Sequence, residues 1–170
     1  EGSDALTLGR LAEASGVTKP VVYDHFGTRE GLLAALYREF DARQTALLDD
    51  ALAGSPATLK GRAGVIAAAY VDCVLAQGRE LPGVIAALGG SPALEQLRRD
   101  GEAEIMARCR TALAPFAKGG RISTAGLRGM MGAAEALSYA AANGEITAKQ
   151  AKAELFETIA AMVNRSANAL

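Results

Sequence analysis

Two short helical segments joined by a glycine turn place the strongest constraint on how this chain can fold. Leu8–Ala14 and Thr18–Phe26 have the length and apolar spacing of short helices, and only Ser15-Gly16-Val17 separates them. Gly16 suits a turn with positive φ, which costs little only in the absence of a Cβ atom. Ala12 stands where two helices crossing at a steep angle would come closest, so we predict a helix-turn-helix. Its inward-facing side chains are predicted to be Leu11, Val17, Val22 and Phe26.

The remainder of the 170-residue chain is also predicted to be helical. Alanine, leucine, glutamate, arginine and methionine fill the long segments, while glycine and proline gather at short intervals that mark turns. Thr28, Ser55-Pro56 and Ser91-Pro92 are typical helix starts, and Thr147-Ala148-Lys149-Gln150 matches a capping box. The sequence therefore predicts an all-α protein in two parts. Residues 1–44 would form the helix-turn-helix domain, and residues 45–170 a larger helical domain.

The composition indicates a folded globular protein. Half of the residues are hydrophobic and 22% are charged, which is enough apolar surface to offset the entropy lost on ordering. No stretch approaches the ~20 apolar residues that span a bilayer, and no signal peptide is evident, so we expect a cytoplasmic protein without a membrane partner. Cys73 and Cys109 lie in no CxxC motif and near no histidine, so we expect buried free thiols and no metal site.

A longer motif carries a family resemblance. From Val17 to Leu33 the sequence reads VTKPVVYDHFGTREGLL, with a small or β-branched cap, a tyrosine, a His-Phe pair and a basic residue just before the next helix. This run resembles the tetracycline-repressor (TetR) family over about the first 35 residues, and the helical remainder has a suitable length. The resemblance implies a transcriptional regulator, most often a repressor, whose affinity for its DNA operator changes when a small organic ligand binds.

The resemblance also implies contacts with the DNA backbone. Thr18, Tyr23 and His25 would approach phosphates and fix the register without reading sequence, and Arg29 would lie near the backbone at the start of the following helix. Two alternatives stay open at this point. Tyr23 could pack against the helical core, and His25 could cap a helix C-terminus.

Base contacts would come from the first turn of the second helix. Lys19 could donate to guanine, and Pro20 or Val21 could touch a thymine methyl group. Lys19 could also be only a solvated surface charge. Asp24 departs from a favourable pattern, because a carboxylate among phosphate-facing side chains repels DNA unless it points away or accepts from cytosine.

The charge of the N-terminal segment is unfavourable for DNA. Residues 1–30 contain the three basic residues Arg10, Lys19 and Arg29 against five carboxylates, and the whole chain has a formal net charge of −1. A DNA-binding surface usually presents an excess of positive charge to phosphates. Members of the resembled family also begin with another helix, so we expect the first helix of this domain to be missing or truncated here.

The helices between about Thr45 and Phe116 are predicted to form a ligand-sensing body. Amphipathic helices that mix small and larger residues can leave an apolar cavity between them, although such stripes can also be ordinary core. No cluster of acids, bases or cysteines is present, so we expect a small apolar or weakly polar ligand and no cofactor. The candidate lining residues are Tyr70, Val74, Leu88, Met106, Cys109, Phe116 and Tyr139.

The last two predicted helices indicate pairing of two chains. Gly126, Gly129 and Gly132 would keep the first of them slim, so a homodimer could form through a four-helix bundle, with packing inside one chain as the alternative. A two-fold dimer would hold two reading helices about 34–36 Å apart, which suits a pseudo-palindromic double-stranded operator. The predicted interface residues are Leu127, Met130, Met131, Leu137, Leu155, Ile159, Met162 and Val163.

Two rival functions have less support. A helical enzyme could use Cys73, Cys109, or the pair Glu102 and Glu104, but residues two apart do not face each other on a helix. No Gly-rich phosphate loop or nucleophile elbow appears, so no catalytic residues are expected. A helical adaptor that binds only proteins is the second rival. Repressor, activator and corepressor-dependent behaviour would all use the same parts.

Overall fold

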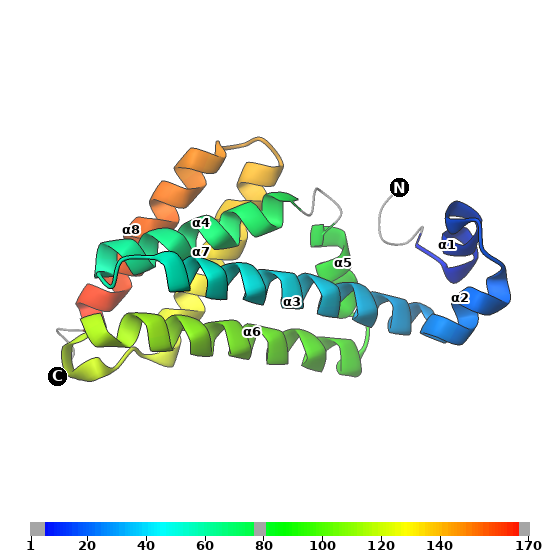
Figure 1. The fold of residues 1–170 in the computed structure, drawn as a ribbon, viewed down its shortest axis with the longest axis horizontal. Helices are drawn as coiled ribbons and strands as arrows, with labels where there is room; N and C mark the ends of the chain where they lie inside the picture. Colours follow the sequence, from blue (N-terminus) through cyan, green and yellow to red (C-terminus); the bar gives the residue numbers. More distant parts are fainter. Residues whose placement is uncertain (1–5, 77–80, 167–170) are drawn as a thin grey trace. The chain divides into compact units, whose positions relative to one another are not determined.

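The computed structural model describes residues 6–76 and 81–166, and every element within these ranges is helical (Figure 1). The predicted all-α fold is therefore confirmed. None of the described helices is long and apolar enough to span a bilayer. In chain order the helices are α1 (Leu8–Ser15), α2 (Lys19–Phe26), α3 (Arg29–Gly54), α4 (Leu59–Ala76), α5 (Leu81–Leu88), α6 (Pro92–Leu113), the short 3-10 helices η2 (Ala114–Phe116) and η3 (Lys118–Gly120), α7 (Thr124–Ala142) and α8 (Ala148–Ser166).

Most helix starts follow the predicted capping chemistry. The hydroxyl groups of Thr28 and Ser91 accept from the backbone N–H three residues further on, at 3.1 and 3.3 Å, before α3 and α6. Before α8, Thr147 and Gln150 exchange hydrogen bonds. The Gln150 side chain accepts from the Thr147 N–H at 2.9 Å, and the Thr147 hydroxyl accepts from the Gln150 N–H at 3.2 Å. The predicted capping box is confirmed.

The start of α4 corrects one prediction. Ser55-Pro56 does not begin a helix, because α4 begins at Leu59 after Thr58, whose hydroxyl accepts from a backbone N–H at 3.0 Å. The hydroxyl of Ser55 instead donates to the Leu52 carbonyl in the last turn of α3, at 3.1 Å. The carbonyls at the end of a helix lack hydrogen-bond partners within that helix. The Leu52 carbonyl therefore accepts from the Ser55 hydroxyl, which the prediction had assigned as a cap of the next helix.

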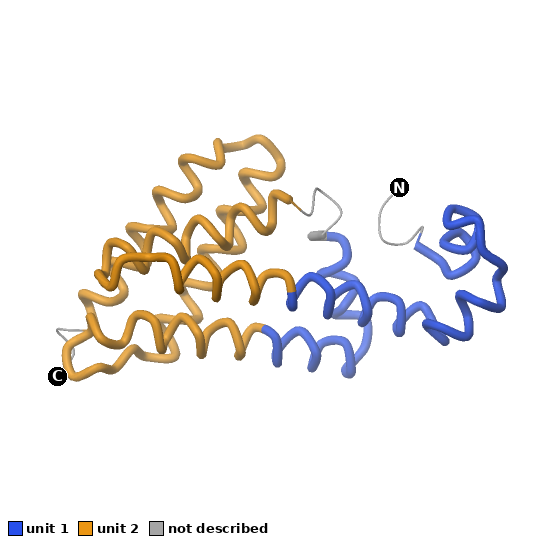
Figure 2. The backbone as a smooth tube through the Cα atoms, in the orientation of Figure 1, with its two compact units in different colours: residues 1–42, 80–101 blue, residues 43–79, 102–170 orange. Residues whose placement is uncertain are grey.

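The chain divides into two compact units (Figure 2). Unit 1 comprises Glu1–Ala42 and Glu80–Gly101, and unit 2 comprises Arg43–Arg79 and Glu102–Leu170. Helices α3 and α6 each contribute residues to both units. The change at residue 42 lies near the predicted boundary between residues 44 and 45, but α5 and the first part of α6 group with the N-terminal helices. The predicted division into a helix-turn-helix domain over residues 1–44 and a larger helical domain over residues 45–170 stays a prediction.

Within unit 1, α6 approaches α3 closely at Gly101. The hydroxyl of Tyr37 on α3 donates to the carbonyl of Arg98 at 3.3 Å. A Cβ atom added to Gly101 would lie 2.8 Å from both the Tyr37 hydroxyl and a carboxylate oxygen of Asp41. The absence of a side chain at Gly101 therefore permits this contact between the two helices.

Unit 2 contains the larger hydrophobic core. Helices α4, α7 and α8 pack on one another, and the later parts of α3 and α6 add Leu48, Ile105 and Leu113. Ion pairs tie the helices at the surface, with Lys152 of α8 at 2.6 Å from Asp72 of α4. Exposed ion pairs contribute little stability, so the core is held chiefly by apolar burial.

Candidate DNA-binding site and ligand cavity

The turn between α1 and α2 has the predicted geometry. Gly16 has a φ of 67°, and the Val17 N–H donates to the carbonyl of Ala12 at 3.2 Å across the turn. Ala12 is only 1% exposed, as expected for the point of closest approach. The hydroxyl of Thr7 caps α1 by accepting from the backbone N–H of Arg10 at 3.2 Å. These contacts fix the direction in which α2 leaves α1.

A small separate core holds the helix-turn-helix together. Leu8, Ala12 and Val22 are buried against Leu32 of α3, with Leu6, Leu11 and Phe26 partly buried around them. The inward positions of Leu11, Val22 and Phe26 are thereby confirmed. The prediction for Val17 was wrong, because its side chain is 43% exposed on the turn, outside this core.

The beginning of α2 presents a free polar group. Thr18 has the extended backbone of an N-cap, with φ −76° and ψ 149°, but its hydroxyl makes no capping hydrogen bond with the helix. Pro20 lies in the first turn, where no intrahelical N–H bond is lost. Thr18, Lys19 and Pro20 are all exposed. The hydroxyl of Thr18 is consequently available to an external acceptor.

Exposed apolar side chains are concentrated on α2 and the turn before it. Val17, Val21 and Tyr23 are 43%, 55% and 51% exposed, and they make up half of the six large exposed hydrophobic residues in the described part of the chain. Val22, between them, is 4% exposed and faces the core. A group of exposed apolar side chains around a capped, rigid turn is typical of a binding surface.

His25 and Arg29 are positioned by contacts within unit 1. The ring of exposed His25 meets the ring of Phe26 edge-on, with a centroid distance of 4.5 Å. Arg29 is partly buried, and its Nε donates to the carbonyl of Leu6 at 3.1 Å. Arg29 thus ties the segment before α1 to the start of α3, a structural role that the sequence did not indicate. Its contact with the DNA backbone stays a prediction.

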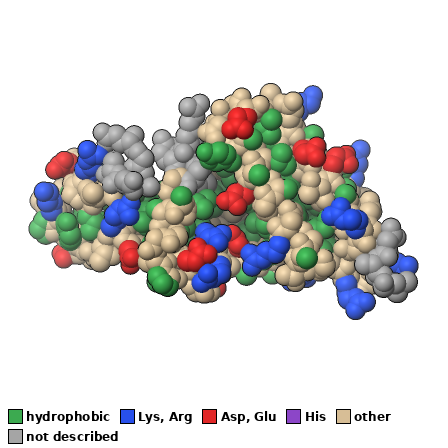
Figure 3. All heavy atoms as spheres, turned by 180° about the vertical axis from the view of Figure 1, so that it is seen from behind, with side chains coloured by type: hydrophobic (Ala, Val, Ile, Leu, Met, Phe, Trp, Pro, Cys, Tyr) green, Lys and Arg blue, Asp and Glu red, His purple; other side chains and the backbone are tan. Residues whose placement is uncertain are grey.

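The chain has 18 lysine and arginine residues and 19 aspartate and glutamate residues, so its formal net charge gives no strong electrostatic bias. Figure 3 shows lysine and arginine side chains interspersed with aspartate and glutamate over one face of the molecule. The two acidic residues suggested as a catalytic pair each face an arginine instead. Glu102 lies 2.8 Å from Arg128, and Glu104 lies 3.1 Å from Arg108. Two carboxylates engaged by different cations are not arranged to exchange a proton with one another.

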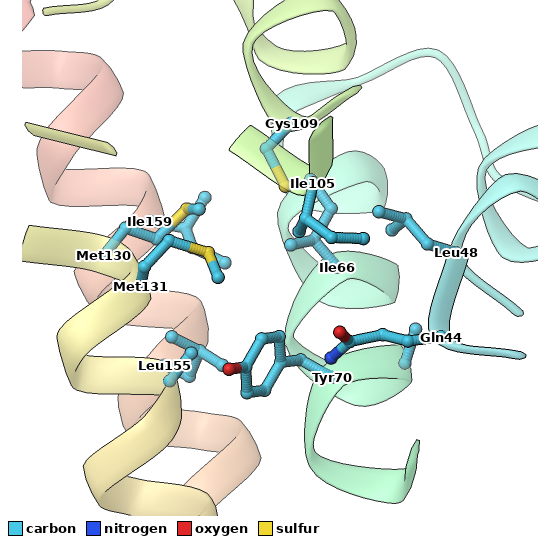
Figure 4. A pocket seen from close by; sticks show the side chains of 12 residues that line it. Gln44, Leu48, Ile66, Tyr70, Ile105, Cys109, Met130, Met131, Leu155 and Ile159 are labelled. Atoms are coloured by element: carbon cyan, nitrogen blue, oxygen red, sulfur yellow. The ribbon is translucent and has the colours of Figure 1, made fainter. Parts of the chain in front are cut away.

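Unit 2 encloses a small apolar cavity between its helices (Figure 4). Its volume is about 10 Å³, close to the space that one water molecule needs. Two of the predicted lining residues, Tyr70 and Cys109, border it. The lining residues are Gln44, Leu48, Ile66, Ala69, Tyr70, Ile105, Cys109, Met130, Met131, Ala134, Leu155 and Ile159.

The other predicted lining residues lie elsewhere. Val74 and Met106 are buried without bordering the cavity, and Phe116 lines an open groove with Arg62 and Arg108. Tyr139 is 49% exposed, and Leu88 belongs to unit 1. These five predictions fail for this cavity because helical spacing shows which face is buried but not which buried position borders a void.

Gln44 is the residue of the cavity that sequence reasoning missed. It is 7% exposed, and its Nε2 has no hydrogen-bond partner in the described part of the chain. A signal was present in the sequence, because Gln44 continues the spacing of Tyr37, Phe40 and Leu48, which are all buried on α3. A buried polar residue within such an apolar stripe normally has a hydrogen-bond partner, so its position indicates a binding role.

Both cysteines are buried thiols. Burial raises the pKa of Cys109 to about 12. Burial also raises the pKa of Cys73, and the positive charge of Arg43 partly opposes this rise. Both side chains are therefore protonated at neutral pH, and a protonated thiol is a poor nucleophile.

The predicted dimer interface needs a substantial correction. Six of its residues are at most 3% exposed and belong to the core of a single chain. These six therefore pack within one chain, which was the alternative to a dimer interface. Met131 and Leu137 are only partly buried. Gly129 and Gly132 of α7 are exposed, and a Cβ atom added to either would meet nothing within 4 Å in the part of the chain that the structure describes. The six buried residues are Leu127, Met130, Leu155, Ile159, Met162 and Val163.

Comparison with known proteins agrees with this architecture. Residues 1–36 match the sequence model of the bacterial regulatory proteins of the tetR family. A protein from Pseudomonas aeruginosa PAO1 assigned as a transcriptional regulator has a similar fold, with a TM-score of 0.81 and 15% identity over 98% of this chain and 85% of that one. A protein from Rhodococcus sp. assigned as a TetR-family transcriptional regulator has a TM-score of 0.74 and 21% identity over 95% and 90%. No curated protein sequence matches the chain.

An N-terminal helix-turn-helix followed by a larger helical body defines a DNA-binding transcriptional regulator. The match places residues 1–36, which include this helix-turn-helix, among sequences similar to the N-terminal region of the tetR family.

Proposed function

We propose that this regulator is a homodimeric repressor whose affinity for a pseudo-palindromic operator changes when a small apolar or weakly polar ligand enters the cavity of unit 2. The observation that carries the proposal is the surface of α2, where Val21 and Tyr23 are more than half exposed on a helix fixed by its own small core. An exposed Val and Tyr beside a free Thr18 hydroxyl suit the mixed apolar and polar edge of a DNA major groove.

Contacts on DNA follow from the exposure of each side chain. Lys19, Pro20 and Val21 would meet base edges, and Thr18, Tyr23 and His25 would donate to phosphate oxygens. Because residues 1–30 contain three basic residues against five carboxylates, these short-range contacts would contribute more of the affinity than long-range attraction. The salt dependence of binding should accordingly be modest for a protein of this class.

Support for ligand control comes from helix α3. It begins at Arg29, directly after the helix-turn-helix, and its later part supplies Gln44 and Leu48 to the cavity. A ligand that favours one arrangement of these side chains would shift the population of α3 conformations and so alter the DNA-binding element attached to it.

Support for a homodimer comes from the outer face of α7. Glycine within a helix destabilises it by roughly 0.5–1 kcal/mol relative to alanine. No neighbour among the described residues needs the small size of Gly129 or Gly132, because a Cβ atom at either would meet nothing within 4 Å there. Close approach of a second copy would explain both glycines, and a two-fold dimer would match a pseudo-palindromic operator. We infer action in the cytoplasm, where the operator lies.

Selection from a random library of duplex DNA tests the DNA-binding proposal. The wild-type protein should enrich a pseudo-palindromic sequence, with enrichment that weakens as salt is raised. Tyr23→Ala should weaken binding to that sequence about tenfold by removing a phosphate contact and apolar area. Leu36→Ala is the matched control, because Leu36 is 39% exposed on α3 and should leave binding unchanged.

Two outcomes would contradict the proposal. Absence of sequence-selective enrichment by the wild type would remove the claim of an operator. Equal binding of the selected sequence by wild type and Tyr23→Ala would remove the role assigned to Tyr23 on α2. A reporter gene placed behind the selected operator should be expressed less when the protein is present, and increased expression would contradict repression.

A further inference from the structure

We propose that the cavity of unit 2 selects small neutral molecules that carry one hydrogen-bond acceptor, such as a ketone, and that Nε2 of Gln44 is the group that recognises the acceptor. This inference rests on the proposed ligand-binding function and specifies its chemistry.

The geometry of Gln44 supports a role in recognition. In Figure 4 its amide extends from α3 toward Tyr70, among the apolar side chains that line the cavity. The residue is 7% exposed, and Nε2 finds no acceptor in the described part of the chain. A buried amide donor without a partner destabilises the folded protein, since it loses its hydrogen bonds to water. A ligand with an acceptor would restore that bond.

The other lining residues define the rest of the ligand. None of the twelve is charged, and burial raises the pKa of the Cys109 thiol to about 12, so no ionised side chain would compensate a charged ligand. Burying an uncompensated charge is strongly unfavourable, which restricts the ligand to neutral molecules. The aliphatic side chains of Leu48, Ile66 and Ile105 favour an apolar body.

The cavity must enlarge to admit such a molecule, because about 10 Å³ holds no more than one water. Met130 and Met131 form part of its wall. Unbranched thioether side chains change rotamer easily and adapt to differently shaped contacts. A compact ligand of about seven heavy atoms is therefore the appropriate first probe.

Binding is tested with cyclohexanone and methylenecyclohexane, which have the same shape but differ in the acceptor. The chain contains four methionines, so the methyl signals of Met130 and Met131 in methyl-labelled protein report binding at the cavity wall by NMR. The ratio of the two dissociation constants is measured for the wild type and Gln44→Leu. Removing the donor should reduce the relative preference for the ketone about tenfold.

Ile105→Leu is the matched control, since it changes the shape of the wall without changing its polarity, and its ratio should equal that of the wild type. An unchanged ratio in Gln44→Leu would overturn the proposal, as would failure of cyclohexanone to bind the wild type. A second measurement guards against misfolding. Without ligand, Gln44→Leu should unfold at a higher temperature than the wild type, and a lower temperature would show that the amide is already satisfied.

The outcome is separable from that of DNA binding. Gln44 lies in unit 2, whereas the residues proposed to touch DNA all lie in unit 1, so operator selection and ketone preference are separate measurements on the wild-type protein. A ketone preference in a protein that selects no operator would overturn the proposed repressor and leave this inference standing. Operator selection without a ketone preference would overturn this inference and leave the proposed DNA binding standing.

Discussion

The two units of this regulator depart from ordinary burial in opposite directions. In unit 1, Val21 and Tyr23 are apolar yet more than half exposed, and in unit 2, Gln44 is polar yet buried without a partner. Both arrangements reduce the stability of the isolated chain, because apolar area stays in water in one case and an amide loses water in the other. Such departures are expected at functional sites, where a partner supplies what the fold omits.

The largest expected effect concerns the core of unit 2. Leu127→Ala should reduce the free energy of unfolding by about 2–5 kcal/mol, because Leu127 is completely buried within one chain. Chemical denaturation at several protein concentrations measures the change. The same loss at every concentration is expected for a core residue. A loss of unfolding free energy that grows on dilution would instead indicate that Leu127 lies in the dimer interface.

The sequence predicted the helix-turn-helix better than it predicted any site in unit 2. Ala12 and Gly16 are specified by local geometry, one by a close crossing and the other by a positive φ, and residues near in sequence satisfy both. In unit 2, the apolar stripes of α7 and α8, which include Leu127 and Leu155, indicate burial but do not show which surface covers them. The partner could be α4 of the same chain or a second copy, and the stripes are identical in both cases.

The second expected effect compares two glycines. Gly101→Ala should lower the free energy of unfolding of the protein by about 1–3 kcal/mol more than Gly64→Ala does. A Cβ atom at Gly101 would lie 2.8 Å from the hydroxyl of Tyr37, whereas one at Gly64 would meet no described residue within 4 Å. Thermal unfolding of the two variants measures the difference. Equal effects would show that the contact between α3 and α6 is easily displaced.

A smaller effect of opposite sign is expected at Ser138. This residue is fully buried on α7, and its hydroxyl has no hydrogen-bond partner in the described residues. Ser138→Ala should therefore raise the free energy of unfolding by about 1 kcal/mol. Ser138 does not border the cavity, so ligand binding should not change. Destabilisation by this variant would weaken the same reasoning applied to Gln44.

The smallest expected effect on stability tests the outer face of α7. Gly132→Ala should stabilise the helix of a single chain by about 0.5–1 kcal/mol, since the added methyl group meets no atom of the described residues within 4 Å. Sedimentation equilibrium should nonetheless show weaker dimerisation, because the methyl group would hold the second copy away. Gly64→Ala, on α4, should leave dimerisation unchanged. Unaltered dimerisation in Gly132→Ala would place the interface elsewhere.

Amide hydrogen exchange on the complex with the selected operator tests the central claim most directly. Exchange across α1, α2 and α3 is compared by mass spectrometry with and without DNA, because bound DNA slows exchange where it covers or stabilises the backbone. We predict that protection is strongest between Thr18 and Phe26, the segment that carries the exposed side chains of α2. Protection confined to helices of unit 2, with α2 unchanged, would contradict the account.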